Sequence, residues 1–111
     1  PDFLTSDHDH EHDEDITSMS LISDVPLDST KFQNWFSGIL QTHGVDILRS
    51  KGILEFKGDD DRFVFQGVHM LMDGAPLGTW PEGERTSRIV FIGRNLETMD
   101  LENGFAACRA T

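Results

Sequence analysis

Three histidines alternate with carboxylates within residues 6–15 of this 111-residue chain. In an extended chain, side chains two residues apart lie on one face, so His8, His10 and His12 can converge on one divalent cation. Imidazole nitrogen is a ligand for zinc, nickel, cobalt and copper, and nearby carboxylates supply oxygen or orient a ring. The segment is predicted to bind zinc or another divalent transition metal weakly. The carboxylates that would help are Asp7, Asp9, Glu11 and Asp13.

The same segment also fits an inert role. Residues 1–15 contain seven of the 20 acidic residues and no Lys or Arg, a composition typical of an acidic, flexible tail or linker. Ordering such a segment costs about 1–2 kcal/mol per residue in backbone entropy, so a tight metal site is not expected without further ligands. Weak metal capture and an inert acidic linker are therefore both open interpretations of this segment.

Four residues outside this segment have side chains suited to chemistry or binding. His69 is expected in a strand, either as a hydrogen-bonded structural residue or as a contact to a partner or ligand. Cys108 falls on the apolar stripe of the expected last helix, which favours a core position over a nucleophile or metal ligand. Trp35 is also predicted in the core, whereas Trp80, in a segment rich in Pro and Gly, fits a cap on the sheet or an anchor at an interface.

The common signatures of enzymes are absent from the sequence. No G-x-x-x-x-G-K-[ST] phosphate loop occurs, and no Gly is followed by Lys, so this chain by itself is not expected to bind or hydrolyse GTP. G-x-S-x-G is missing, and H-E-x-x-H starting at His10 fails because Glu14 stands where the second His would be. The single Cys excludes C-x-x-C and an intrachain disulfide. The chain is therefore predicted not to be an enzyme.

Charge and hydropathy narrow the function classes further. The net charge is −11, but residues 16–111 contain 13 acidic and nine basic residues, and the basic ones are scattered along the sequence. Nucleic-acid binding by a basic surface is therefore not expected. No apolar run approaches the roughly 18 residues of a membrane span, so no membrane contact is expected. A lone Cys favours the cytoplasm or another reducing intracellular compartment.

Residues 16–111 are predicted to form one domain that would position these side chains. Asp28 as N-cap and Gly44 as terminator bound a helix, because the residues between them carry an apolar stripe at helical spacing. The stripe consists of Phe32, Trp35, Phe36, Ile39, Leu40 and His43. A second helix is predicted within residues 95–109, where Leu101, Phe105 and Cys108 share one face.

Four segments read as strands: 16–23, 47–56, 62–72 and 86–93. The second and third are predicted to pair as an antiparallel hairpin, and residues 73–85 to form a loop around Trp80, because two prolines and several glycines disfavour regular structure there. The order strand-helix-strand-strand-strand-helix predicts an α+β fold: a two-layer structure whose largely antiparallel four-stranded sheet has its helices on one face.

Several of these segments are similar to the C-terminal domain of CobW-type GTPases. The resemblance is carried by residues 47–54 (ILRSKGIL), 64–69 (VFQGVH), 87–94 (SRIVFIGR) and 104–108 (GFAAC), with support from the His-Asp tract and residues 16–20 (ITSMS). It implies a family of GTP-dependent metal chaperones linked to zinc homeostasis, cobalamin synthesis or nitrile hydratase activation. In that family an N-terminal P-loop domain carries GTP, magnesium and a CxCC metal motif, and neither motif occurs in this sequence.

The resemblance therefore implies a regulatory and partner-binding domain of a GTP-dependent zinc chaperone, with residues 1–15 collecting metal. The expected partners are the N-terminal GTPase domain of the parent protein and a metalloprotein client. The alternative from a different class is a structural protein-protein interaction or oligomerisation module whose acidic segment is an inert linker.

Overall fold

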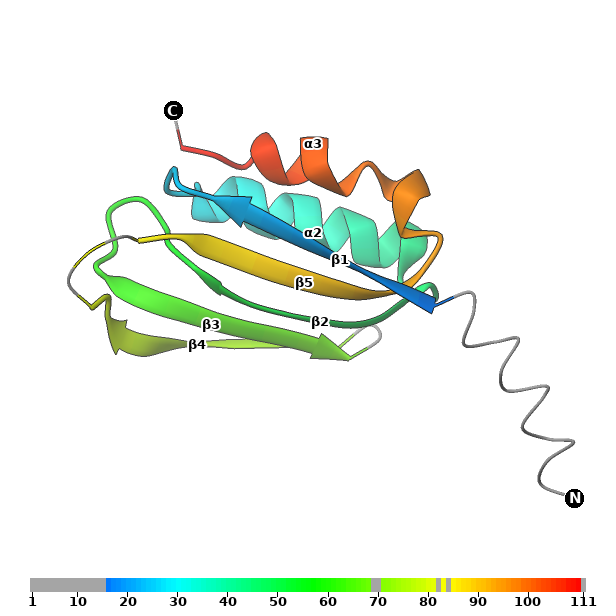
Figure 1. Ribbon diagram of the computed structural model, residues 1–111, viewed down its shortest axis with the longest axis horizontal. Helices are drawn as coiled ribbons and strands as arrows, with labels where there is room; N and C mark the ends of the chain where they lie inside the picture. Colours follow the sequence, from blue (N-terminus) through cyan, green and yellow to red (C-terminus); the bar gives the residue numbers. More distant parts are fainter. Residues whose placement is uncertain (1–15, 69–70, 82, 84, 111) are drawn as a thin grey trace, which may run out of the picture.

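The computed structural model describes residues 16–110 except 69, 70, 82 and 84. Within them the chain forms five strands, two α-helices and one short 3₁₀ helix, η1. Their bounds are β1 (Ile16–Ser23), α2 (Ser29–His43), β2 (Ile47–Leu54), β3 (Asp61–Val68), β4 (Leu71–Thr79), β5 (Ser87–Arg94), η1 (Leu96–Met99) and α3 (Leu101–Ala106). In Figure 1, α2 and α3 lie together on one side of the sheet, which makes the predicted two layers.

The sheet has the strand order β1-β5-β2-β3-β4, and each neighbouring pair is antiparallel. The last strand of the sequence, β5, lies between β1 and β2, while β1 and β4 form the edges. The predicted α+β class, the antiparallel hairpin of β2 and β3, and the helices on one face are confirmed. The predicted number of strands is wrong, because the sheet has five strands rather than four.

The additional strand is β4, which occupies most of the segment predicted as a loop. The loop prediction for residues 73–79 is wrong, and the single strand predicted over 62–72 covers β3 from its second residue onward and also the first two residues of β4. Pro76 is tolerated because β4 is an edge strand and because Pro76 lies next to the register shift between Arg62 and Phe63, where pairing with β3 is irregular. Residues 72–79 are exposed, so β4 projects beyond the layer covered by helices.

Helix α2 forms as its sequence predicts. The Asp28 carboxylate accepts a hydrogen bond from the backbone N–H of Lys31 at 2.9 Å, which satisfies a donor that the first helical turn leaves free. The apolar stripe faces the sheet, and its most buried ring, Phe36, lies 4.8 Å from Phe65 of β3 and 6.1 Å from Phe91 of β5, measured between ring centroids. Aromatic packing between α2 and the sheet therefore forms the centre of the core.

The predicted C-terminal helix is interrupted. Asn95 and Asp100 have φ angles of 57° and 54°, and these left-handed conformations separate η1 from β5 and from α3. Asn and Asp adopt this conformation more readily than most residues. Leu101, Phe105 and Cys108 are nevertheless buried as predicted, because the break comes before the part of the segment that carries them.

Replacing Gly104 with Ala should destabilise the domain by about 1–2 kcal/mol, although Ala is the better helix former by about 1 kcal/mol. An added Cβ would overlap the indole nitrogen of Trp35, where α3 packs against α2. The indole cannot move freely, because its ring lies 6.2 Å from the ring of Phe91 and 6.0 Å from that of Phe105. Urea unfolding followed by tryptophan fluorescence measures the change.

Gly38→Ala in α2 is the matched control. A Cβ added at Gly38 meets nothing within 4 Å, so the same substitution should stabilise the domain by about 1 kcal/mol through helix propensity alone. If both substitutions stabilised the domain equally, close packing at Gly104 would not be the reason that α3 contains a glycine.

Candidate functional site

The side of the sheet that faces away from α2 and α3, called the open face below, carries a set of residues that the core does not use. Along β5, buried residues alternate with half-buried or exposed ones, which are Arg88, Val90, Ile92 and Arg94. The buried set includes Ile89 and Phe91 and belongs to the core under the helices. Because successive side chains of a strand point to opposite sides, the other set lies on the open face.

Basic residues gather on the open face. Five of the nine Lys and Arg residues occupy its strand positions: Arg49 and Lys51 of β2, Arg62 of β3, and Arg88 and Arg94 of β5. Strand register brings them together, since Lys51 lies opposite Val90 and Arg88 lies opposite Ile53. Among the described strand positions on this side, Asp73 of β4 is the acidic residue. The basic residues are scattered along the sequence, but the fold concentrates more than half of them on one surface.

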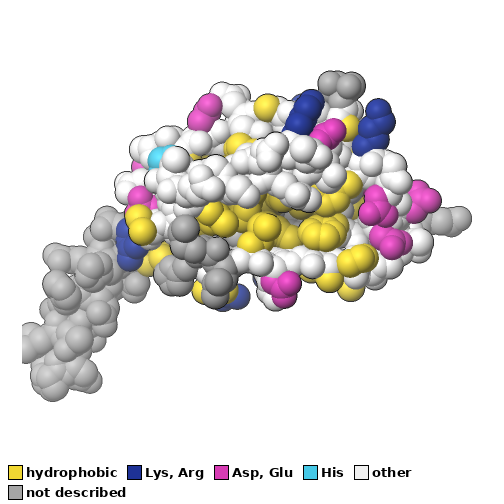
Figure 2. Space-filling view, turned by 180° about the vertical axis from the view of Figure 1, so that it is seen from behind, with side chains coloured by type: hydrophobic (Ala, Val, Ile, Leu, Met, Phe, Trp, Pro, Cys, Tyr) yellow, Lys and Arg dark blue, Asp and Glu magenta, His cyan; other side chains and the backbone are white. Residues whose placement is uncertain are grey.

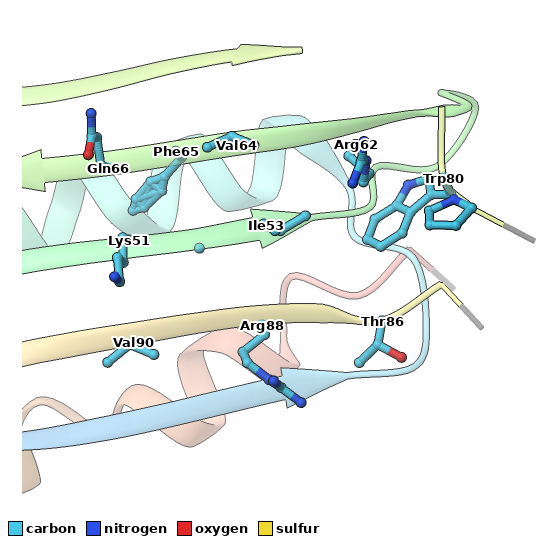
Figure 3. A pocket seen from close by; sticks show the side chains of 12 residues that line it. Lys51, Ile53, Arg62, Val64, Phe65, Gln66, Trp80, Thr86, Arg88 and Val90 are labelled. Atoms are coloured by element: carbon cyan, nitrogen blue, oxygen red, sulfur yellow. The ribbon is translucent and has the colours of Figure 1, made fainter. Parts of the chain in front are cut away.

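A groove runs along the open face. At one end it widens into a cavity of about 610 Å³, whose lining includes Ile53, Arg62, Val64, Trp80, Arg88 and Val90. Figure 3 shows Trp80 beside Arg62 at one end of this cavity, with Lys51, Gln66 and Val90 toward the other. A smaller hollow of about 90 Å³ shares Lys51, Gln66 and Val90 and continues toward Arg49, Val68 and Ile92. The groove therefore has an apolar floor with basic side chains around it.

The basic residues of the groove are not neutralised by ion pairs within the described part of the chain. Both ion pairs there belong to Arg85, whose Nη1 lies 3.6 Å from Glu55 and 3.3 Å from Asp60. The groove also contains two polar donors, the Trp80 Nε1 and the Arg62 Nε, that are buried without a hydrogen-bond partner among the described residues. Such a surface is suited to a ligand that supplies negative charge and hydrogen-bond acceptors.

The predicted metal ligands His8, His10 and His12, and their four helper carboxylates, lie outside the described residues. His69 also lies outside them. Among the described residues, no group of three or more His, Cys, Asp or Glu side chains is placed to hold a metal ion. The metal site in residues 1–15 therefore stays a prediction.

Cys108 is a core residue, as predicted. Its side chain is 1% exposed, and its Sγ donates a hydrogen bond to the carbonyl oxygen of Gly104 at 3.3 Å. Burial raises the pKa of the thiol from 9.0 to about 11. At neutral pH the thiol is protonated, so it is neither an activated nucleophile nor a ready metal ligand.

The two tryptophans have different environments. Trp35 packs against the core, which confirms its prediction, whereas Trp80 lines the groove.

The groove was not predicted from the sequence. The signal was present as period-two alternation of basic and aliphatic residues in 49–53, 62–68 and 88–94, which places both kinds on the same side of neighbouring strands.

Among the described residues no helix is long and apolar enough to cross a membrane. In comparisons with known proteins, residues 16–109 match the family model described as the cobalamin synthesis protein cobW C-terminal domain. The chain is 30% identical over 95 residues to the zinc chaperone YjiA of Escherichia coli (strain K12), covering 86% of this chain and 30% of YjiA.

Two solved structures also resemble this chain, each with a TM-score of 0.81 and 30% identity, covering 86% of this chain and 30% of the other. They are the Zn(II)-bound YjiA GTPase from E. coli and a Zn(II)-bound triple mutant of the YjiA GTPase. The chain thus spans about 30% of the length of the relatives it matches. On the match over nearly all described residues, the chain belongs to the family of cobW C-terminal domains.

Proposed function

We propose that this chain is the C-terminal regulatory and partner-binding domain of a GTP-dependent zinc chaperone, and that nucleotide chemistry belongs to a separate N-terminal GTPase domain. The observation that carries the proposal is the match of residues 16–109 to the cobW C-terminal family. The similarity to 30% of a relative named a zinc chaperone supports it. The sequence contains no phosphate-loop motif, which is consistent with nucleotide binding by a separate domain.

Residues 1–15 would collect zinc in this proposal. Their three alternating imidazoles supply nitrogen ligands, and their acidic side chains raise the local concentration of cations. Zinc would be cargo here, because the described core is built from hydrophobic residues and needs no metal to complete it. A metalloprotein client in a reducing intracellular compartment is the proposed recipient.

The surface of the β3–β4 hairpin supports contact with a further domain. Met72 and Leu77 of β4 are 47% and 51% exposed, and Phe56 and Phe63 lie partly buried at the edge of the core. Figure 2, which views the molecule from behind, shows a patch of hydrophobic side chains on the face turned to the viewer. An exposed edge strand with apolar side chains is commonly covered in the complete protein, and we propose the GTPase domain as its cover.

The alternative function is a structural interaction or oligomerisation module, which the same exposed hairpin would also serve. The coding sequence immediately upstream of Pro1 discriminates the two. A phosphate-loop motif and a CxCC motif encoded there would support the chaperone, and their absence would support the structural module.

Calorimetry should detect no saturable, magnesium-dependent GTP binding by residues 1–111. The chain lacks the glycine-rich loop and the lysine that hold nucleotide phosphates, so no site of that kind can form. The longer parent protein, titrated under the same conditions, should bind GTP. Saturable binding by the 111-residue chain, or none by the parent, would contradict the proposed division between the two domains.

A further inference from the structure

The open face combines positive charge with exposed apolar side chains. The described part of the domain neither neutralises this charge by ion pairs nor covers these side chains. The open face carries five basic residues in a chain whose net charge is −11. It also exposes aliphatic side chains: Ile22, Ile53 and Val68 are 51%, 38% and 49% exposed. Exposed apolar groups with basic residues around them are suited to an extended segment that carries acidic and apolar side chains together.

The chain itself contains such a segment. Residues 1–15 have no Lys or Arg, and their acidic residues are Asp2, Asp7, Asp9, Glu11, Asp13, Glu14 and Asp15. Phe3 and Leu4 are adjacent apolar residues near the far end of the same segment. Its composition is therefore complementary to the groove in both charge and hydrophobicity.

The point of attachment allows the segment to reach the groove. Ile16, the first residue of β1, lies opposite Arg94 at one end of the open face. Thr86, Arg88 and Trp80 line the cavity at the other end. The distance along β5 from Arg94 to Arg88 is about 20 Å, since a strand rises about 3.4 Å per residue. Fifteen extended residues span up to about 50 Å, so the segment can turn back and cover the groove.

We propose that residues 1–15 dock in cis on the open face, with their carboxylates against Arg94, Lys51 and Arg88 and with Phe3 and Leu4 in the cavity beside Trp80. A short tether gives a segment an effective concentration of the order of millimolar, so weak individual contacts suffice for docking. The carboxylates and apolar side chains make these contacts, and docking therefore does not depend on zinc binding by the histidines.

Paramagnetic relaxation in the full 111-residue chain tests the docking. A nitroxide attached at Thr5→Cys labels the segment selectively, because the native thiol of Cys108 is 1% exposed. With an effective concentration of the order of millimolar, amides of Ile53, Val64 and Val90 should lose about half or more of their signal intensity, and those of α2, on the other side of the sheet, should lose less. In 0.5 M NaCl the screening length falls to about 4 Å, and the open-face signals should recover.

Two charge-reversal pairs show whether the open face is responsible. K51E/R88E reverses two basic residues in the groove and should abolish the broadening. K31E/K57E makes the same change in net charge at two exposed residues off the open face and should leave the broadening intact. Replacing the four acidic residues Asp7, Asp9, Glu11 and Asp13 with their amides should also abolish it while leaving residues 16–111 unchanged, which keeps the test valid if K51E/R88E fails to fold.

Four results would overturn the proposal. Broadening confined to the residues next to Ile16 would show that the segment does not reach the groove, and equal broadening in both charge-reversal pairs would show that the basic residues do not hold it. Broadening seen only between labelled and unlabelled copies would identify a second copy as the occupant. If the nitroxide does not broaden the open-face signals but an added single-stranded oligonucleotide shifts them, the ligand of this face is nucleic acid instead.

Discussion

Phe36→Ala should lower the free energy of unfolding by about 3–5 kcal/mol, the usual cost of removing a fully buried aromatic ring. Phe36 is 0% exposed and lies between the two layers. Its ring centroid is 5.8 Å from that of Phe32, 4.8 Å from that of Phe65 and 6.1 Å from that of Phe91. The substitution leaves a cavity between α2 and two strands of the sheet, which the surrounding rings cannot fill without losing their own contacts.

A loss of this size is a large part of the stability of a small domain, which is typically about 5–15 kcal/mol. Urea unfolding followed by circular dichroism should show a much lower midpoint with the same transition slope. Val45→Ala is the control, because Val45 is 79% exposed and its truncation should change stability by no more than about 0.5 kcal/mol. A change below about 1 kcal/mol for Phe36→Ala would contradict the central position assigned to this ring.

The helix α2 could be predicted closely from the sequence because its signals are local. Asp28 caps the first turn, the apolar stripe repeats at helical spacing, and the helix ends at His43, immediately before Gly44. Each signal depends on residues within one or two turns, so no knowledge of the rest of the fold is needed. Strand β1 was likewise predicted with its observed bounds, Ile16–Ser23.

Strand β4 could not be predicted in the same way, because its order comes from pairing with β3 rather than from its own residues. Its sequence, LMDGAPLGT, contains two glycines and a proline, and in isolation it favours a turn. The break at Asp100 was missed for a related reason. Asp is compatible with a helix start and with a left-handed turn, and only packing of α3 against the rest of the domain decides between them.

The groove shows a different limit of sequence reasoning. Counting basic residues along the chain gives a scattered set, and this led to the expectation that no basic surface binds nucleic acid. Strand order changes that result, because β5 lies between β1 and β2 although it comes last in the sequence of strands. Arg88 therefore lies beside Ile53 and close to Lys51, which precedes it by 37 residues. Charge patterning has to be evaluated by strand face and by neighbouring strands before a basic surface is excluded.

Replacing His8, His10 and His12 together with Asn should remove most zinc binding by the 111-residue chain. Substitution of residues that only support metal ligands typically costs about 10–100-fold in affinity, so loss of three ligands should cost at least that much. The acidic residues stay in place, but carboxylates alone are poorer ligands for zinc than imidazole. His43→Asn, at the end of α2, is the matched control and should leave the affinity unchanged.

Lowering the pH should weaken zinc binding by the unmodified chain, as the triple substitution does. A free imidazole has a pKa near 6.5, and its protonated form has no lone pair for a metal, so zinc affinity should fall as the pH is lowered from about 7.5 to about 5.5. Zinc titrations of both proteins at the two pH values measure this, and circular dichroism with a chelator should show the fold of residues 16–111 unchanged.

Equal affinity in the parent and the triple variant would mean that the histidines are not the ligands. No measurable binding at either pH would favour the inert linker, and the docking of residues 1–15 on the open face would still be testable, because it depends on carboxylates rather than imidazoles.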